Sequence, residues 1–314
     1  MKVYRALAEL DHDFGPCVLT IGNFDGVHAG HRSILRRVVK LARERGWKPS
    51  AVTFHPHPLK IVAPERAPKL LTTPEERVEL MAAEGITQVL ILPFTPELMQ
   101  MPPRDFACGI VAQRLDAKAV LVGDNFRFGH GHSGDTNTLA ACGRECGFDV
   151  EAIPALRMRG RIVSSSEVRK LVRAGQVALA GRMLERPFAL AGRVVKGRGI
   201  GSERTVPTLN LAPATEVLPL IGVYATRTTD PDGGRRWRSV TNVGCRPTFD
   251  DCPDLSVETF LLDPFDGAAP ARIRVEFLTR LREERRFAGA EALKAQILKD
   301  VERARKYFRL ARVC

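Results

Sequence analysis

The sequence has no long apolar run: nowhere do its 314 residues approach the roughly 18 consecutive apolar residues of a membrane-spanning helix. It also starts without the pattern of a secretory leader, because Glu9, Asp11 and Asp13 interrupt the N-terminal segment before a long apolar stretch can form. We therefore expect a cytoplasmic protein that has no membrane partner.

Aromatic residues are scarce, at 6% of the chain, whereas the charge is strongly basic, with 48 Lys and Arg against 36 Asp and Glu and a net charge of +12. Proteins that bind single-stranded nucleic acid interleave basic residues with aromatic rings on which bases stack. Here the arginines are dispersed and no such interleaving occurs. We therefore expect small phosphorylated substrates and no nucleic-acid partner, and keep a nucleic-acid-binding protein as the rival interpretation of the charge.

Cysteines are few and odd in number, seven in all, so they cannot all pair within the chain. Cys142 and Cys146 are one helical turn apart, but no second pair of cysteines completes a zinc site. We expect reduced thiols.

The chain is long enough for two hydrophobic cores, and its first half alternates short apolar runs with helical patterns. This alternation predicts an α/β domain with a parallel sheet over residues 1–186. One helix is expected to begin after Thr73, where Pro74 and Glu76 complete a capping box, and to end at Gly85. The expected strands are Val18–Ile21, Ala51–Phe54, Gln88–Leu92, Ala119–Val122 and Asp149–Ile153.

The second half, residues 187–314, has the pattern of an antiparallel β-barrel or sandwich. A helical pattern over Ser166–Leu184 precedes it, which places the domain boundary near Arg186. The expected strands are Phe188–Val195, Gly222–Thr228, Trp237–Val243, Ser256–Leu262 and Ile273–Phe277. A C-terminal helix follows, in which Leu293, Ile297, Val301, Ala304 and Phe308 share one face.

The most informative motif is Gly22-Asn23-Phe24-Asp25-Gly26-Val27-His28-Ala29-Gly30-His31, which lies between an apolar run and an amphipathic helical pattern. A strand, a tight turn and a helix start aim backbone N–H groups and the positive end of a helix dipole at an anion. His28 and His31 add donors that can stabilise charge developing on a phosphate. The same histidines could simply cap the helix, but the preceding strand and turn favour phosphate binding.

Three other segments end strands or begin a helix where ligands of parallel sheets bind. Gly123–Gly129 carries polar and aromatic side chains, and the prolines of Phe54–Pro58 can wall a flat ligand. Val163–Arg169 places three serines and an arginine at a helix start, a set that suits a polyphosphate. The simpler alternatives are a glycine-flanked loop, a serine N-cap and, for His55 and His57, half of a metal site with no further ligands.

The Gly-x4-Gly-Lys-Ser/Thr signature occurs nowhere in the chain, which argues against a P-loop kinase. A glycine-rich turn over residues 197–201 could instead bring backbone amides to phosphates. Thr208 and Asn210 offer two oxygen ligands to Mg²⁺, and Glu258 in an apolar strand suits a general base. The plainer alternatives are an ordinary loop, a turn-bonded Thr/Asn pair and a carboxylate that faces solvent.

Taken in order, Gly22–His31, Phe54–Pro58, Gly123–Gly129 and Val163–Arg169 resemble the adenylyltransferase half of the bacterial bifunctional riboflavin kinase/FAD synthetase family. The segments Pro207–Asn210, Asn242–Phe249 and Val257–Asp263 resemble its flavokinase half, so the match covers nearly the whole chain. The resemblance implies an α/β Rossmann-like nucleotidylyltransferase domain followed by an antiparallel β-barrel flavokinase domain with a C-terminal helix.

The resemblance also implies a bifunctional enzyme. Its expected reactions are phosphorylation of riboflavin to FMN by ATP and adenylylation of FMN to FAD with release of pyrophosphate. Mg²⁺ is the implied cofactor, ATP the co-substrate, and riboflavin and FMN the small-molecule substrates. The alternative is a monofunctional FMN adenylyltransferase with a non-catalytic flavin-binding barrel, and the sequence leaves open whether the chain forms a homo-oligomer.

The roles that the resemblance implies fall on the matching positions. His28 and His31 would act in adenylyl transfer, and ATP would be bound there by Gly22, Asn23, Phe24, Gly26, Gly30, Ser164, Ser165 and Arg169. The flavin would be bound by Phe54, Pro56, Pro58, Asn125 and Phe128. In the kinase, Gly197, Gly199, Gly201, Thr208 and Asn210 would bind ATP, the last two also Mg²⁺, and Glu258 would be the general base. The sequence departs from the usual family pattern before Pro207, at Leu209, where alanine is usual, and at Ser166, where threonine is common.

Overall fold

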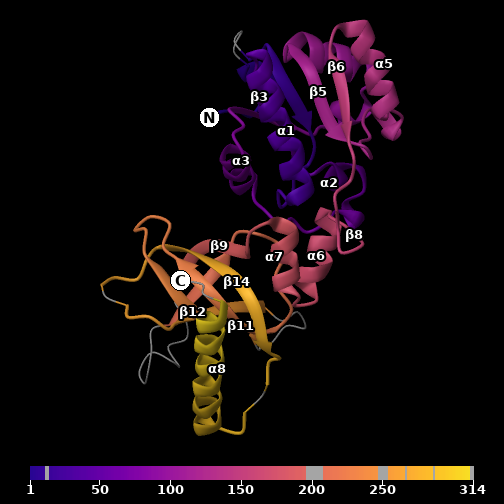
Figure 1. The fold of residues 1–314 in the computed structure, drawn as a ribbon. Coiled ribbons are helices and arrows are strands. Elements are labelled where there is room, and N and C mark those ends of the chain that lie inside the picture. The colour runs from indigo at the N-terminus through magenta and orange to yellow at the C-terminus, as the bar shows by residue number, and fades with distance from the viewer. Residues whose placement is uncertain (11–13, 196–207, 247–253, 266, 286, 312–314) are drawn as a thin grey trace. The chain divides into compact units, whose positions relative to one another are not determined.

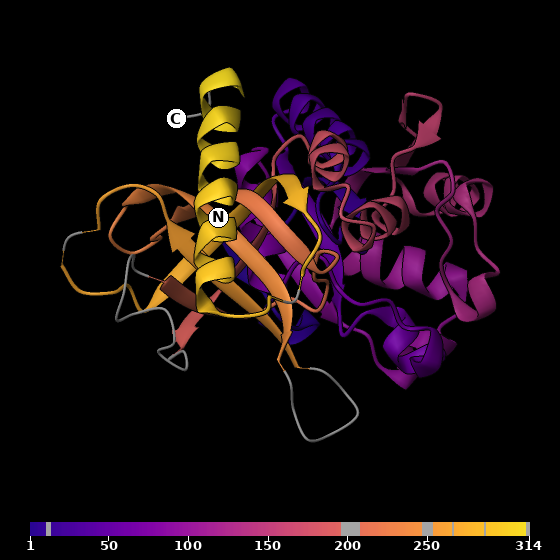
Figure 2. The same cartoon turned by 90° about the horizontal axis from the view of Figure 1, so that it is seen from below.

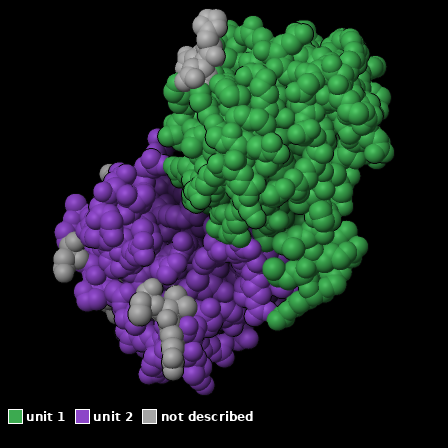
Figure 3. Space-filling view, turned by 45° about the horizontal axis from the view of Figure 1, so that its top comes forward, with its two compact units in different colours: residues 1–165 green, residues 166–314 purple. Residues whose placement is uncertain are grey.

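The computed structural model describes residues 1–10, 14–195, 208–246, 254–265, 267–285 and 287–311. The chain forms two compact units, Met1–Ser165 and Ser166–Cys314 (Figure 3). The boundary expected near Arg186 falls after the two helices that open the second unit, and it remains a prediction about where the two activities divide. Among the described residues, no helix has the length and apolar character needed to cross a membrane.

A six-stranded parallel sheet with the order β1-β4-β3-β2-β5-β6 forms the centre of the first unit (Figure 1). All five expected strands are confirmed, and the edge strand β1 was not predicted. The strands are β1 (Lys2–Tyr4), β2 (Cys17–Ile21), β3 (Lys48–His55), β4 (Gln88–Pro93), β5 (Ala117–Gly123) and β6 (Asp149–Ile153). A short hairpin, β7 (Arg157–Met158) and β8 (Arg161–Ile162), follows and was also not predicted.

Helices cover both faces of this sheet, which confirms the Rossmann-like α/β class. Neighbouring residues of β2 show the two faces: Val18 belongs to the core cluster that contains Leu35 of α1, and Leu19 to the cluster that contains Phe106 of η3. The helical elements are η1 (Leu7–Glu9), α1 (Ala29–Arg45), α2 (Pro58–Val62), η2 (Pro64–Arg66), α3 (Pro74–Ala83), α4 (Pro96–Gln100), the π-helix η3 (Asp105–Arg114), η4 (His130–His132) and α5 (Thr136–Cys146).

Local capping explains where the helices begin and end. The predicted capping box of α3 is present, because the Thr73 hydroxyl accepts from the Glu76 N–H and the Glu76 carboxylate accepts from the Thr73 N–H. The helix α1 ends at Gly46, whose φ of 68° is the left-handed conformation that glycine adopts without strain. These caps fix the ends of the helices that flank the sheet.

The single helical pattern expected over Ser166–Leu184 is wrong in one respect, because the segment forms two helices, α6 (Ser165–Arg173) and α7 (Val177–Leu184). Gly175 lies between them with φ 72°, and a Cβ at this position would lie 2.9 Å from Cδ of Arg280. The break therefore depends on a glycine that the apolar periodicity did not reveal.

The second unit closes into an antiparallel barrel with the order β10-β13-β12-β11-β14-β9. The five expected strands are confirmed, whereas β10, which carries Thr208 and Asn210, was not recognised as a strand. The strands are β9 (Phe188–Val195), β10 (Thr208–Pro213), β11 (Gly222–Thr229), β12 (Arg236–Arg246), β13 (Asp254–Leu261) and β14 (Arg272–Arg282). The C-terminal helix is α8 (Ala290–Ala311).

The expected buried face of α8 is only half correct. Ala304 and Phe308 pack with Val223, Ala225 and Val240 on the outside of the barrel, as predicted. Leu293 and Ile297, on the same face, are 40% and 37% exposed. Figures 1 and 2 show the reason: one end of α8 lies against the barrel strands and the other extends beyond them.

One cysteine pair contradicts the expectation of reduced thiols, because Cys108 and Cys146 are joined in a disulfide. Cys108 lies in η3 and Cys146 at the end of α5, and these two elements pack together on the same face of the sheet. The sequence spacing directed attention to Cys142 and Cys146, whereas the partner of Cys146 comes from a different helix.

A chain of buried hydroxyls crosses three strands of the barrel. Thr226 bonds to Ser239 (2.8 Å) and Thr241 (2.7 Å), Thr228 bonds to Ser239 (2.8 Å), and Thr241 bonds to Thr259 (3.1 Å). All five residues are fully buried. Buried hydroxyls are tolerated only when they are hydrogen-bonded, so this chain ties β11, β12 and β13 together in one register.

We predict that Thr226→Val lowers the free energy of unfolding of the barrel by about 1–3 kcal/mol, because it removes one hydrogen-bond partner from each of two buried hydroxyls, those of Ser239 and Thr241. The measurement is denaturant unfolding followed by Trp237 fluorescence in a Trp47→Phe background, since these are the two tryptophans of the chain. Thr229→Val, at a half-buried position on the same strand, is the matched control. Equal stability of the two variants would contradict a structural role for the hydroxyl chain.

Candidate functional site

The sheet order places the switch point of the first unit between β2 and β5. From β2 the chain builds outward through β3 and β4, and it then crosses to the other side to add β5 and β6. Ligands of such sheets bind outside the carboxyl ends of the strands at this point. The loops there are residues 22–28 after β2 and 124–135 after β5. The predicted binding segments Gly22–His31 and Gly123–Gly129 overlap these two loops.

The loop after β2 has an unusual backbone. Phe24, Gly26 and Val27 have φ values of 47°, 80° and 37°, so two residues with side chains adopt the left-handed region. This conformation is rare for a β-branched residue such as Val27, and it persists only where the surroundings enforce it. The Phe24 ring is buried and lies 5.1 Å, centroid to centroid, from the ring of His31.

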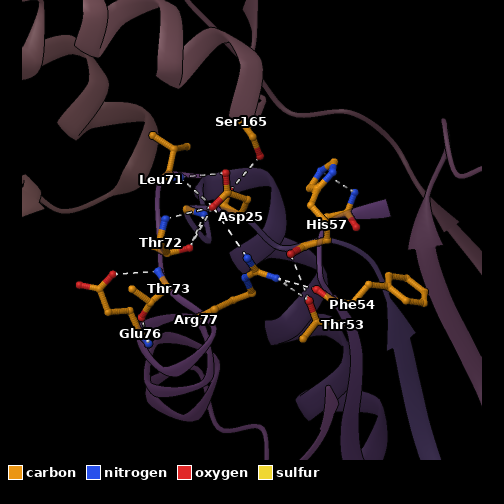
Figure 4. A network of polar contacts seen from close by, with 12 residues as sticks. Asp25, Thr53, Phe54, His57, Leu71, Thr72, Thr73, Glu76, Arg77 and Ser165 are labelled. Atoms are coloured by element: carbon orange, nitrogen blue, oxygen red, sulfur yellow. Dashed lines mark hydrogen bonds and ion pairs between the residues drawn. The ribbon is translucent and has the colours of Figure 1, made fainter. Parts of the chain in front are cut away.

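The side chain of Asp25 holds this loop in place through hydrogen bonds to a neighbouring segment (Figure 4). Its carboxylate, 1% exposed, accepts hydrogen bonds from the N–H groups of Leu71 and Thr72 and from the Thr72 hydroxyl, at 3.0 to 3.1 Å. The Thr72 hydroxyl oxygen in turn accepts from the Gly26 N–H at 3.0 Å. A buried carboxylate is stable only when donors surround it, so Asp25 determines the path of the loop that carries the histidines.

Arg77 of α3 connects this loop with the end of β3. Its guanidinium lies 4.0 Å from the Asp25 carboxylate and is 3% exposed. It also donates to the Thr53 hydroxyl oxygen at 3.0 Å and to the Phe54 carbonyl oxygen at 3.4 Å. The Thr53 hydroxyl donates to the carbonyl oxygen of Asn23 at 3.1 Å. The buried guanidinium of Arg77 therefore connects the predicted ATP loop with the predicted flavin segment.

Sequence reasoning assigned no role to Asp25 or Arg77. Asp25 stood inside the motif, but the turn residues around it received the attention. Arg77 carried a usable signal, because it is one helical turn before the buried Met81, and a charge on the buried face of a helix calls for a partner.

Ser165 is linked to the same network. Its hydroxyl donates to the carbonyl oxygen of Asp25 at 2.8 Å, and it is the first residue of α6 (Figure 4). Ser164 precedes it, and Arg169 lies one turn further along the helix and is buried. The hydroxyl proton of Ser165 therefore helps to hold the loop in place.

His28 caps α1. Its Nδ1 accepts from the His31 N–H at 3.3 Å, so the neutral imidazole carries its proton on Nε2. A Cβ at Gly30 would lie 3.2 Å from Cε1 of His28, so the glycine leaves space for this ring. The capping role that the sequence left open is therefore present, and it directs a donor nitrogen away from the helix.

The His31 ring stacks on that of His28, with centroids 3.6 Å apart and planes 16° from parallel. Burial, the neighbouring His28 and the cation of Arg77 lower the pKa of His31 well below its ordinary value of 6.5. The Nδ1 of His31 is buried and has no hydrogen-bond partner among the described residues. At neutral pH His31 is therefore an uncharged imidazole held beside the helix N-terminus.

The predicted flavin segments lie after β3 and β5. Phe54 is half-buried and meets Phe94 edge-on, with centroids 5.8 Å apart, and Pro56 and Pro58 are also half-buried. Asn125 is exposed, whereas Phe128 is 8% exposed and is covered by Phe126, whose ring stacks on it at 5.5 Å. The more accessible ring of this loop is therefore that of Phe126.

Of the two histidines considered as half of a metal site, His55 and His57, the structure shows hydrogen-bonding roles for His57. His57 Nδ1 accepts from the Leu59 N–H and caps α2, and its Nε2 lies 3.3 Å from Nδ2 of Asn23. This contact joins the loop after β2 to the segment after β3. Among the described residues, the group that metal-ligand geometry brings together is Cys108, Glu145 and Cys146, whose two sulfurs are already bonded to each other.

In the barrel, strand register brings the predicted kinase residues together. Asn210 is the cross-strand partner of Glu258, and Glu258 is also the partner of Asn242 on the next strand. Partners in antiparallel strands share one face, so these three side chains form a row on the outer face, two residues along the strands from the Thr208–Phe260 pair. Asn242 stood in a quoted motif without a role. Gly197, Gly199 and Gly201 lie outside the described residues.

The depressed pKa of His31 predicts how stability depends on pH. The unfolded chain binds a proton at His31 below about pH 6.5 and the folded chain does not, so stability falls as pH decreases from 6.5, by at most about 1.4 kcal/mol per pH unit. Denaturant unfolding of the first unit at pH 7.0 and pH 5.5 measures this loss. In His31→Gln the loss should be smaller by that amount; an unchanged loss would contradict a buried, neutral His31.

The comparisons with known proteins cover both units. The FAD synthetase family model matches residues 10–167, and the riboflavin kinase family model matches residues 184–308. The bifunctional riboflavin kinase/FMN adenylyltransferase of Pseudomonas fluorescens is 38% identical over 305 residues, which are 97% of each chain. The protein of the same name from Escherichia coli K12 is 36% identical over 315 residues, 99% of each chain.

A solved structure shows the same fold. The structure titled a macrolide-efflux protein from Streptococcus pneumoniae has a TM-score of 0.85 and covers 96% of this chain and 98% of its own, at 24% identity. At that identity the likeness concerns the fold alone. The family models and the full-length relatives decide the family: the chain belongs to the bifunctional riboflavin kinase/FMN adenylyltransferases.

Proposed function

We propose that this chain catalyses both reactions that its relatives are named for. The barrel would transfer the γ-phosphate of ATP to riboflavin, and the first unit would transfer the adenylyl group of a second ATP to FMN. The observation that carries the adenylyl-transfer proposal is the stacked His28–His31 pair at the N-terminus of α1, next to a loop fixed by a buried carboxylate. Since both reactions consume ATP, we place the enzyme in the cytoplasm.

In adenylyl transfer, a phosphate oxygen of FMN attacks the α-phosphorus of ATP, the bond to the bridging oxygen of the β-phosphate breaks, and pyrophosphate leaves. Negative charge grows on the α-phosphate oxygens and on the leaving group. The Nε2–H of His28, the amides at the start of α1 and its helix dipole stabilise this charge. His31 contributes as a neutral hydrogen-bonding imidazole, because its low pKa keeps it uncharged.

The remaining residues of the adenylyl-transfer site hold the two substrates. Gly22, Asn23, Phe24, Gly26 and Gly30 form the turn that receives the ATP phosphates, with Ser164, Ser165 and Arg169 supplying hydroxyls and a cation at the start of α6. Phe54, Pro56, Pro58, Asn125 and Phe128 would line the flavin side, together with Phe126, the more accessible ring of its loop. Catalysis then consists of orientation and charge stabilisation without a covalent intermediate.

In the kinase, Glu258 would accept the proton of the riboflavin 5′-hydroxyl as its oxygen attacks the γ-phosphorus of ATP. The pairing of Glu258 with Asn210 in the strand register supports this proposal, because the proposed base and the proposed phosphate ligand would share one face of the barrel. The oxygen donors of Asn210 and Thr208 are of the hard type that Mg²⁺ prefers, and bound Mg²⁺ would neutralise charge on the β- and γ-phosphates. The glycine-rich turn over residues 197–201 would complete the ATP site.

Two variants should separate the reactions. His28→Ala combined with His31→Ala should lower FAD formation from FMN and ATP by at least about 10²-fold, because it removes two donors from the developing charge. The same protein should still convert riboflavin to FMN. Glu258→Gln should show the opposite pattern and lower FMN formation by about 10²–10⁴-fold.

The measurement is incubation with riboflavin or FMN, Mg²⁺ and ATP, with the products resolved by chromatography over time. His12→Ala, which lies outside every predicted binding segment, is the matched control and should retain both activities. Loss of both products in a folded histidine double variant would contradict separate sites. Absence of FMN formation by the unmodified protein would select the monofunctional alternative.

A further inference from the structure

The Cys108–Cys146 disulfide joins two helical elements of the first unit. Cys108 lies in the π-helix η3 and Cys146 is the last residue of α5, with Cα atoms 5.6 Å apart, well within the range of about 4.4–6.8 Å that disulfides require. Both cysteines are half-buried, so small thiol reagents can reach them. Neither residue takes part in the proposed reactions.

The disulfide encloses the loop after β5, which is part of the proposed flavin site. The Phe106 ring, two residues before Cys108, lies 5.9 Å from the ring of Phe128. The His130 N–H donates to the carbonyl oxygen of Met101 at 2.9 Å, just before η3. Beyond the loop, Asp135 caps α5, the helix that ends in Cys146. Both anchors of the loop are therefore elements that the disulfide ties together.

The other two cysteines of the first unit differ from this pair. Cys17 is completely buried, and burial raises its pKa to about 12. Cys142 is also buried, and burial together with the charge of Glu145 raises its pKa. Because the thiolate is the reactive form, both side chains are poor nucleophiles. Thiol chemistry in this unit is therefore directed to Cys108 and Cys146.

An ion pair spans the same two elements. Arg104, four residues before Cys108, pairs with Glu145, the neighbour of Cys146. Phe106 and Ala107 of η3 and Leu139 of α5 also belong to one core cluster. These contacts do not depend on the sulfurs, so they keep the two thiols close together after reduction and allow the bond to form again.

We propose that Cys108 and Cys146 are a reversible thiol–disulfide site that sets the affinity of the adenylyl-transfer site for FMN, an inference that rests on the proposed function. In the oxidising direction, one thiolate attacks a low-molecular-weight disulfide such as oxidised glutathione and releases one thiol. The second thiolate then attacks the mixed disulfide and releases another, so two electrons pass to the reagent and two protons are lost. A reduced thiol reverses both steps.

The oxidised form should bind FMN more tightly. Closing the ring between Cys108 and Cys146 restricts the conformations open to the loop that carries Phe126 and Phe128. A loop that is ordered beforehand loses less entropy when its ligand binds, which raises affinity without any new contact. The kinase site has no part in this ring and should not respond.

The experiment compares the full-length protein after incubation with oxidised glutathione and with dithiothreitol, with free thiols counted under denaturing conditions. We expect two fewer free thiols in the oxidised form. We also expect its KM for FMN, and its FMN dissociation constant measured by fluorescence titration, to be at least threefold lower than in the reduced form. The KM for riboflavin should be unchanged. In Cys108→Ser and in Cys146→Ser, the FMN affinity should be the same after either treatment. Cys142→Ser should respond to the two treatments like the unmodified protein.

Equal FMN affinity in two forms whose thiol counts differ by two would overturn the proposal, as would a thiol count that does not change. A rise in thermal stability alone would mean that the bond is merely structural. If neither form makes FAD, the proposed function fails, and the fluorescence titration still decides between the two outcomes for the cysteine pair.

Discussion

The proposed adenylyl-transfer site depends on one buried carboxylate and the cation beside it. Asp25 accepts hydrogen bonds from Leu71 and Thr72, and Arg77 lies 4.0 Å from it while reaching Thr53 and Phe54. Burying these charges is costly unless each finds partners, so the arrangement exists only when the loop after β2 follows its strained path. That path brings His28 and His31 to the N-terminus of α1. Burial and the neighbouring His28 lower the pKa of His31, and the cation of Arg77 adds to this effect.

The two units bring their proposed phosphate-binding residues together by different means. In the first, parallel strands end together at the switch point, and loops bring residues that are distant in sequence to that edge. In the barrel, the antiparallel register determines which residues are neighbours, because pairing β10 with β13 sets Asn210 opposite Glu258 without any loop. The conformation of a loop can change, for example when a disulfide at its ends forms or breaks. The strand register, in contrast, is fixed by the chain of hydroxyls and by packing inside the barrel.

The fold class followed from periodicity, because strands buried on both faces and an alternating barrel pattern are local signals. Interactions between distant segments were not accessible in the same way. Gly175 ends a helix through its left-handed backbone, Cys146 pairs with a cysteine of another element, and Phe128 is covered by Phe126. Among the site residues, His28 and His31 stood out because both lie on one turn. Arg77 acts through contacts with Thr53 and Asp25, which only the folded chain brings near.

The most direct test of this account replaces Arg77. Steady-state FAD synthesis by Arg77→Gln and Arg77→Lys is compared with FMN synthesis by the same proteins, which reports that the barrel is folded. We expect Arg77→Gln to lower kcat/KM for both ATP and FMN in adenylyl transfer by at least about tenfold, since both loops lose their shared partner. Arg77→Lys should lose less activity, because lysine keeps the charge but lacks the fork of donors. FAD synthesis that is unchanged in a folded Arg77→Gln protein would contradict the central role of this cation.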